Sequence, residues 1–486
     1  MIAAGVPGAP ISSRSVQGSP SRPARVGIAG TFDVDNFGDV LFPHVARNEL
    51  ERRLPGVEIR SFSPLGRASA WDRGATSEAL GPWSEERLDE LRDSLDCLLI
   101  GGGDIIHTRF ERIADCYGIG EDEIRALQLD RFFIDGLGTE REAARPVVWN
   151  GVGVPFDLSP EEEARVRKAL DGRPYVAVRD RGSAARLEAV GAGGVEVVPD
   201  TAILVPRLVG AEVRGKRLRQ LRAMGWWPED GRILLIQGNA ALEPFLDGLA
   251  DGVRRILEAR PDLTPVTISL GPCHGDDRFA AALAQRLGRP VPHVPGEGSL
   301  EDMVAAIAAA TGFVGSSLHG NITAFAHDVP GVILDMNQHA KHRGFAEMTG
   351  DLGMLVSDPA ELAEAFLAQV RRDRTGDIER LQMRADDHFD RIARVVEAAV
   401  APDAEPARVS SEERLVELER ELETLRRAYE ARSRRLASDA AAYADQIAAQ
   451  RIPMRKAEEF LRSRTYRYVS WLRAVYLGVR RPFGRR

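Results

Sequence analysis

The chain has few cysteines and no long apolar run. Its 486 residues include only three cysteines, Cys97, Cys116 and Cys273, and no two of them have the spacing of a metal-binding or redox motif. An odd and sparse set of thiols is typical of a reducing compartment. No stretch of about eighteen apolar residues occurs, which excludes a membrane-spanning helix. We therefore expect a soluble, cytoplasmic protein without a metal site.

Complete nucleotide-binding fingerprints are missing as well. Neither a Gly-x-Gly-x-x-Gly turn nor a Walker A loop is present, although several short apolar runs end in glycine. Residues 1–24 are rich in Gly, Pro and Ser and lack the continuous apolar core of a signal peptide, so we interpret them as a disordered leader. The missing fingerprints give no sign of a bound nucleotide, and we expect no cofactor.

Charge is divided unevenly along the chain. The net charge is −8, but Arg451–Arg486 holds eleven Lys or Arg against two Glu, a net +9, which leaves −17 for the rest. A basic end on an acidic body argues against nucleic-acid binding and favours one local contact with an anionic surface.

Short apolar strands alternate with amphipathic helical stretches in two series. The first series occupies residues 25–210 and the second occupies residues 232–400, with residues 211–231 as the connection. Such alternation predicts parallel sheets covered by helices on both faces. We therefore expect an α/β protein with two doubly wound, Rossmann-like domains.

The C-terminal region predicts a helical extension. Residues 401–410 form a Pro- and Ala-rich acidic linker, and residues 411–450 carry apolar residues at 3–4 spacing, which is typical of a short coiled coil. This segment is either a dimerising helix or a solvated spacer. Residues 451–486 mix aromatic and basic side chains on one helical pattern. They favour a peripheral contact with the inner face of the cell membrane over a helix docked on the protein.

Polar residues follow the strands of the first series, where ligands of α/β sheets bind. Asn36, Gly38 and Asp39 lie at a helix start, whose N–H groups favour an anion; Asp39 is either a helix cap or a base. In IGGGD, Gly102 and Gly103 permit close approach of a ligand beside Asp104.

Two further strands of the first series also end in polar groups. Arg179 ends a strand that should be buried on both faces, so its guanidinium needs an anionic ligand or an ion pair with Asp180 or Asp200. Asn150 lies in the neighbouring apolar run. We include Asn150, Arg179 and Asp200 among the candidate substrate-binding residues.

The second series contributes a histidine and a basic cluster. His319 begins a helix of small residues, two positions after Ser317 and directly before Gly320, and an imidazole there can transfer protons near neutral pH. Lys341 and Arg343 follow the next strand and are candidates for holding an anionic substrate.

Taken in order, these segments resemble the polysaccharide pyruvyl transferase family. The similar stretches are NFGDV, IGGGD, VRDRGSAARLEAVG with VVPDTAIL, and SSLHGNITAFAHDVPGVILDMNQHAKHRGF. The resemblance covers roughly residues 25–395 and implies a glycosyltransferase-B-like pair of domains. Many relatives have arginine two residues before the histidine, where this chain has Ser317.

The resemblance implies transfer of the pyruvyl group of phosphoenolpyruvate onto hydroxyls of a surface or extracellular glycan, free or lipid-linked, as a cyclic ketal. It makes His319 the acid/base residue and Asp39 a candidate base, and it gives Arg179 and Lys341 to the donor's anionic groups. The alternatives are a nucleotide-sugar-dependent glycosyltransferase of the same fold and a non-catalytic scaffold in glycan assembly.

Overall fold

The computed structural model describes residues 22–401 except 69–70, 72–76, 138–144 and 172. The predictions for the leader up to residue 21, and for the linker, coiled coil and basic tail from residue 402 onward, lie outside these residues and stay predictions. No helix among the described residues is long and apolar enough to cross a bilayer.

The first lobe is built on a seven-stranded parallel sheet. Its strand order is β3-β2-β1-β4-β5-β6-β7. The central strands are continuous apolar runs, as in CLLIG, because helices cover both faces of a parallel sheet. The strands are β1 (Arg25–Ala29), β2 (Glu58–Ser63), β3 (Glu78–Ala79), β4 (Cys97–Gly101), β5 (Val147–Val152), β6 (Tyr175–Val178) and β7 (Val195–Val197).

The second lobe repeats this design with six parallel strands. Its order, β10-β9-β8-β11-β12-β13, corresponds strand for strand to the first six positions of the other sheet. Both orders are those of a Rossmann fold, which confirms two doubly wound α/β domains. The strands are β8 (Arg232–Gln237), β9 (Leu263–Ile268), β10 (His293–Val294), β11 (Gly312–Gly315), β12 (Gly331–Leu334) and β13 (Leu355–Val356).

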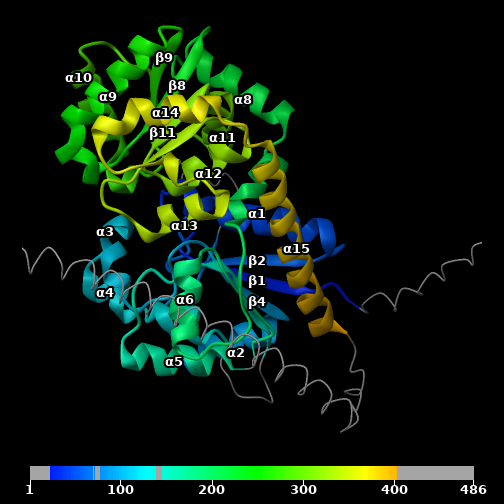
Figure 1. Ribbon diagram of the computed structural model, residues 1–486. Coiled ribbons are helices and arrows are strands. Elements are labelled where there is room, and N and C mark those ends of the chain that lie inside the picture. Colours follow the sequence, from blue (N-terminus) through cyan, green and yellow to red (C-terminus); the bar gives the residue numbers. More distant parts are fainter. Residues whose placement is uncertain (1–21, 69–70, 72–76, 138–144, 172, 402–486) are drawn as a thin grey trace, which may run out of the picture. The chain divides into compact units, whose positions relative to one another are not determined.

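Helices flank both sheets (Figure 1). Those that follow the strands of the first lobe are α1 (Phe37–Arg53), α2 (Glu85–Ser94), α3 (Ala114–Tyr117), α4 (Glu121–Ala126), α5 (Pro160–Leu170), α6 (Arg181–Ala189) and α7 (Val205–Leu208). The remainder are α8 (Ala211–Ala223), α9 (Leu246–Ala259), α10 (Asp276–Leu287), α11 (Leu300–Ala309), α12 (Leu318–Ala326), α13 (Ala340–Thr349), α14 (Leu362–Arg371) and α15 (Thr375–Val400).

Short helical turns complete the chain. The two that matter for the site are η3 (Thr201–Leu204), after β7, and η5 (Pro272–His274), after β9. The others are η1 (Phe110–Ile113), η2 (Arg131–Asp135), η4 (Ala240–Phe245), η6 (Leu352–Met354) and η7 (Pro359–Glu361).

Two expected boundaries differ from the structure. Residues 211–231, expected to be a connection, contain helix α8, which packs against α11 of the second lobe. The final helix, α15, falls in the expected second domain but packs against the first lobe, beside α1 and β6 (Figure 1). There the Tyr175 hydroxyl lies 2.8 Å from Nδ1 of His388, and Arg53 pairs with Asp390 at 2.7 Å.

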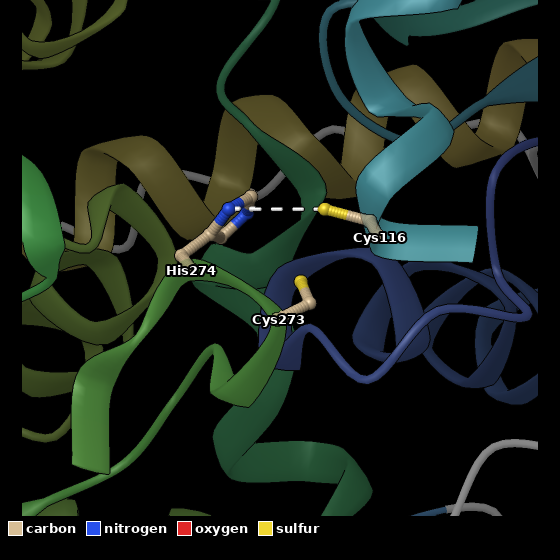
Figure 2. Close-up of side chains that lie close together, drawn as sticks. All are labelled: Cys116, Cys273 and His274. Atoms are coloured by element: carbon tan, nitrogen blue, oxygen red, sulfur yellow. Dashed lines mark hydrogen bonds between the residues drawn. The ribbon is translucent and has the colours of Figure 1, made fainter. Parts of the chain in front are cut away.

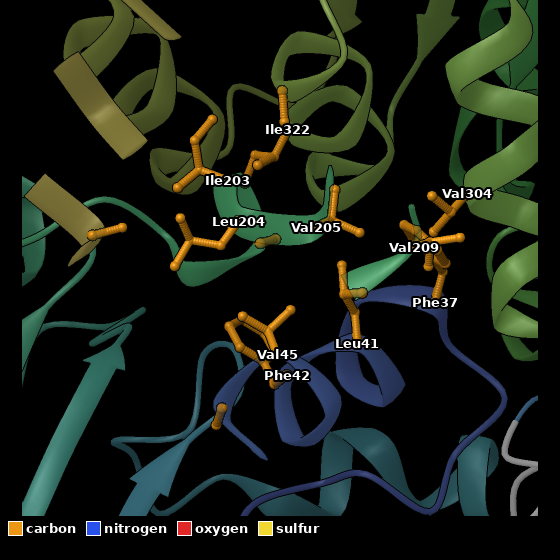
Figure 3. Packing of buried hydrophobic residues seen from close by; sticks show 14 of the residues in the cluster. Phe37, Leu41, Phe42, Val45, Ile203, Leu204, Val205, Val209, Val304 and Ile322 are labelled. Atoms are coloured by element: carbon orange, nitrogen blue, oxygen red, sulfur yellow. The ribbon is translucent and has the colours of Figure 1, made fainter. Parts of the chain in front are cut away.

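An apolar seam joins the lobes. Helix α1 and turn η3 of the first lobe pack against α11 and α12 of the second lobe in one continuous hydrophobic cluster (Figure 3). The backbone N–H of Phe37 also donates to the carbonyl oxygen of Leu270 across the seam, at 2.8 Å. A buried interface of this kind holds the strand ends of both sheets in a defined relation.

Candidate active site between the lobes

The N-terminal turn of α12 places the predicted acid/base residue. Ser317 caps this helix, because its hydroxyl oxygen accepts from the backbone N–H of Gly320 at 3.2 Å. The backbone N–H of Ser317 donates to Oε1 of Gln237, at the end of β8, at 2.7 Å. A Cβ on Gly320 would lie 2.7 Å from Leu270, so only glycine fits there. These contacts fix the start of the helix and with it His319.

His319 reaches across the seam into the first lobe. Its Nε2 lies 3.4 Å from Oδ2 of Asp200, which begins η3, and its ring meets Phe42 of α1 edge-on at 5.0 Å between centroids. A Cβ at position 38 would overlap Nδ1 of the imidazole, so the His319 ring occupies the space that a side chain at position 38 would need. Sequence position alone assigned Gly38, Asp200 and His319 to the site separately; the fold brings them together.

Asp39 also faces this point, in the first turn of α1. Asn36 caps that helix, because its Oδ1 accepts from the N–H of Gly38 at 3.0 Å, so of the two roles considered for Asp39 the helix cap is wrong. Asp39 instead accepts from the Thr31 hydroxyl at 3.1 Å. Burial raises the pKa of Asp39 to about 6, against the lowering effect of His319.

The glycine-rich turn after β4 passes close to Asp39. Gly102 and Gly103 have φ values of +106° and +83°, which side chains rarely adopt, and a Cβ on Gly103 would lie 3.5 Å from Oδ1 of Asp39. The turn thereby also directs Asp104 toward the end of β6.

Arg179 is enclosed by carboxylates. Its side chain is 3% exposed and pairs with Asp104, while Asp200 lies 3.7 Å and Asp180 4.0 Å away. Burial would raise the pKa of Asp200, but the charges of His319 and Arg179 outweigh it and hold that pKa below its usual value. An ion pair was the alternative to an anionic ligand, and the geometry favours it. Arg179 holds Asp104 and Asp200 in place rather than presenting a free cation.

Of the two predicted cations after β12, only Lys341 faces the first lobe. Its Nζ lies 4.0 Å from Oδ2 of Asp104, and 39% of its side chain is exposed. Arg343 pairs with Glu347 one turn further along α13 and is 69% exposed. The structure therefore does not bring Arg343 to the site.

Asn150 also lies away from the site, where it contacts α15. Its Oδ1 accepts from Nε2 of His388 at 2.7 Å, and the residue is 1% exposed. This bond, with the Tyr175 contact, fastens α15 to the first sheet. We see no ligand-facing atom in Asn150.

Two adjoining cavities lie beside these residues, and Lys341 borders both. The first has a volume of about 210 Å³ and is lined by Asn36, Gln237, Leu270, His274, Ser317 and His319. The second has a volume of about 300 Å³ and is lined by Asp104, His107, Arg109, Arg112, Phe156 and Arg186. The smaller cavity presents His319, and the larger one presents three arginines beside Asp104.

Sequence reasoning missed the cations of the larger cavity. Arg109 and Arg112 lie over the ring of Phe156, at 4.6 and 5.2 Å from its centroid. Within the described residues, neither guanidinium has an ion pair. Both follow the IGGGD turn by only a few residues, and that proximity was the available signal.

A second omission concerns thiols. Spacing along the chain predicted no metal site, but the fold brings Cys116 of α3 to Cys273 and His274 of η5, with one ligand atom from each within 4.8 Å of the others. Cys116 and Cys273 are 157 positions apart in sequence, so motif spacing gives no sign that they meet.

Comparison with solved structures finds distant likenesses. A UDP-GlcNAc 2-epimerase from Neisseria meningitidis, bound to UDP-GlcNAc, is 11% identical, with a TM-score of 0.46 over 77% of this chain and 99% of that one. A putative UDP-N-acetylglucosamine 2-epimerase from Listeria monocytogenes is 14% identical, with a TM-score of 0.47 over 79% and 99%. An O-GlcNAc transferase mutant from Thermobaculum terrenum is 15% identical, with a TM-score of 0.40 over 80% and 71%.

Family comparison is more specific. No curated protein matches the chain. The sequence model described as polysaccharide pyruvyl transferase matches residues 36–338, a span that includes Asp39, Asp200 and His319 and covers more than half of the chain. The chain therefore belongs to the polysaccharide pyruvyl transferase family.

Proposed function

We propose that the enzyme transfers the pyruvyl group of phosphoenolpyruvate to two hydroxyls of a glycan, forming a cyclic ketal and releasing phosphate. The observation that carries this proposal is the meeting of His319 with Asp39 and Asp200 across the seam, beside Lys341. Family membership supports pyruvyl transfer to a polysaccharide in general. The donor and the residue roles are our proposal.

The donor chemistry matches the residue types. Phosphoenolpyruvate carries a phosphate and a carboxylate, so it needs cations and helix N-termini. Lys341 is the cation at the boundary of the two cavities, and the first turn of α12, whose Leu318 and His319 line the smaller cavity, supplies a helix N-terminus. Arg109 and Arg112 take over the anion-binding role that the sequence assigned to Arg179 and Arg343.

His319 acts as the general acid. Protonation of the methylene carbon of the donor by the imidazolium leaves a cationic centre at C2, which the first sugar hydroxyl attacks as Asp39 accepts its proton. Asp200, 3.4 Å from Nε2, stabilises the imidazolium and orients the ring. The raised pKa of Asp39 suits a base that works near neutral pH.

Closure of the ketal completes the reaction. The second sugar hydroxyl attacks the same carbon, the C–O bond to phosphate breaks, and the proton of this hydroxyl leaves with phosphate or returns through His319. When the second hydroxyl proton leaves with phosphate, the methyl proton has come from His319 and the first hydroxyl proton is on Asp39, so transfer of that proton from Asp39 to His319 restores both residues. The reaction requires acid, base and anion contacts held in one place.

The proposal is tested by incubating the purified protein with phosphoenolpyruvate and candidate glycans, measuring phosphate release and the new methyl signal by NMR. We expect His319→Gln to lower kcat by about 10²–10⁴-fold, the usual contribution of a general acid–base group. His293→Gln is the matched control, because His293 also pairs with an aspartate, Asp277 at 2.9 Å, but lies on β10.

Two results would contradict the proposal. One is full activity in His319→Gln. The other is no phosphate release with any acceptor while a nucleotide-sugar binds, which would favour the glycosyltransferase alternative. A glycan phenotype in cells that survives His319→Gln would favour the scaffold.

A further inference from the structure

Two thiols and an imidazole lie close together at the edge of the smaller cavity. Cys116 comes from α3 of the first lobe, and Cys273 and His274 come from η5 of the second (Figure 2). Sγ of Cys116 lies 3.8 Å from Nδ1 of His274, and one ligand atom from each residue lies within 4.8 Å of the other two. The third cysteine, Cys97, is buried within β4 and takes no part.

These separations are those of ligands around one metal ion. In tetrahedral zinc sites the Zn–S and Zn–N distances are about 2.3 and 2.0–2.1 Å, which separates sulfur from nitrogen by roughly 3.6 Å. Two thiolates and an imidazole are a donor set that favours Zn²⁺ over harder cations such as Mg²⁺ or Ca²⁺. The 3.8 Å separation between Sγ of Cys116 and Nδ1 of His274 is that of a hydrogen bond to sulfur in the metal-free protein, and it is close to the value for two ligands of one ion.

The surroundings suit an exchangeable ion. Cys116 and Cys273 are partly buried, and His274 is exposed, so an ion can enter. Nε2 of His274 lies 3.1 Å from the side-chain amide nitrogen of Asn36, which stands where an outer partner of a metal-bound imidazole would lie but is itself a donor. His274 and Asn36 also line the 210 Å³ cavity next to His319.

We propose that Cys116, Cys273 and His274 bind a zinc-class divalent ion that links the two lobes. Three protein ligands leave a fourth position for water or for an oxygen of a molecule in the adjoining cavity. Since one ligand comes from the first lobe and two from the second, the ion stabilises the arrangement that holds Gly38 against His319. The site is independent of the donor proposed above.

Metal content of the full-length protein, purified under reducing conditions, is the first measurement. We expect about one zinc per chain after dialysis against excess Zn²⁺ and removal of loosely bound ion. Substitution with Co²⁺ should produce sulfur-to-cobalt charge-transfer absorption, a signature of thiolate ligation. A competing chelator titrated against the loaded protein gives the affinity.

Variants separate the site from adventitious binding. Cys116→Ser, Cys273→Ser and His274→Ala should each weaken zinc binding by more than about 100-fold, since loss of an outer partner alone costs 10–100-fold. Cys97→Ala is the matched control and should retain the metal. Far-UV circular dichroism and thermal melting of each metal-free variant show whether it folds, and zinc should raise Tm in the parent protein but not in the three ligand variants.

Asn36→Asp tests the geometry without removing a ligand. With the metal on Nδ1, the ring proton lies on Nε2 and needs an acceptor; a carboxylate can accept it while still capping Gly38. We expect tighter zinc binding, by about tenfold. Zinc bound with the same affinity in all three ligand variants would overturn the proposal. The absence of both stoichiometric zinc and a cobalt–thiolate band in the reduced protein would also overturn the proposal. This holds even if Cys116 and Cys273 are found to form a disulfide when the protein is exposed to a disulfide oxidant.

Discussion

The two lobes share one scaffold and differ in charge where they meet. Both sheets have the same strand order, and both contribute residues that follow the ends of their strands. The first lobe contributes carboxylates, Asp39, Asp104 and Asp200, whereas the second contributes His319 and Lys341. His319 and its carboxylate partners therefore come from different lobes. A repeated fold thus supports a divided site, because side chains after the strands vary without changing the sheet.

Arg179 is the buried cation among the carboxylates of the first lobe. Its guanidinium neutralises three neighbouring carboxylates, so replacing it tests how far the lobe depends on this one charge. We expect Arg179→Met to lower the free energy of unfolding by about 3–5 kcal/mol, because buried carboxylates lose their partner. Urea denaturation measures this effect. Arg343→Met, at the exposed pair with Glu347, should change stability by less than about 0.5 kcal/mol. Equal stability losses in both variants would contradict the structural role of Arg179.

Gly38 tests whether the lobes must approach this closely. A methyl group there overlaps the His319 ring, so Gly38→Ala should displace the imidazole and lower kcat/KM by about 100-fold. Gly193→Ala is the control, since no atom lies within 4 Å of its added Cβ. Phosphate release from phosphoenolpyruvate is the measurement. Unchanged activity of Gly38→Ala would show that the contact is dispensable.

The two cations of α13 sharpen the comparison on the side of the second lobe. Lys341→Met should raise KM for phosphoenolpyruvate by about tenfold, since loss of one anion contact costs about 1.4 kcal/mol, whereas Arg343→Met should leave KM unchanged. Steady-state kinetics with a fixed acceptor distinguishes them. The reverse result would move the donor site toward the outer face of α13.

The pH dependence reports on the first lobe. A base with a pKa of about 6 is ionised above that value, so kcat/KM should fall about tenfold between pH 7 and pH 5. The effect of pH on stability has the opposite sign to its effect on kcat/KM. The folded pKa of Asp39 exceeds its unfolded value, so this group disfavours the fold as pH rises through 6. Asp39→Asn should therefore have a higher free energy of unfolding than the parent protein above pH 6. Its residual kcat/KM should no longer fall between pH 7 and pH 5. A parent profile that is flat from pH 5 to 7 would exclude Asp39 as the base.

Short-range patterns were sufficient for the domain architecture. Apolar runs such as RVGIA and CLLIG, each followed by glycine and a helical pattern, predict parallel strands and place Asp39, Asp104 and His319 at strand ends. The extents of the lobes were harder to predict. Helix α15 continues the second series in sequence but packs on the first lobe, through contacts such as Tyr175–His388 that no local pattern specifies.

Charged residues show the same limit at the site. Arg179 and Arg343 looked alike in sequence, as cations after strands, but one is enclosed by carboxylates and the other lies at an exposed helix surface. Burial and partners come from residues distant in the chain, so the type of residue at a strand end does not decide its role.

By itself, the amino-acid sequence determined the two parallel sheets, the glycines that permit tight turns and the position of His319 at a helix start, because each depends on residues a few positions apart. Only the tertiary structure decided that His319 faces Asp200, that Arg179 is neutralised, and that Cys116 meets Cys273 and His274. The His319–Asp200 contact and the Cys116–Cys273–His274 cluster join different lobes, and the Arg179 ion pairs join distant segments of the first lobe. Hydrophobic packing along the seam holds the two lobes in contact.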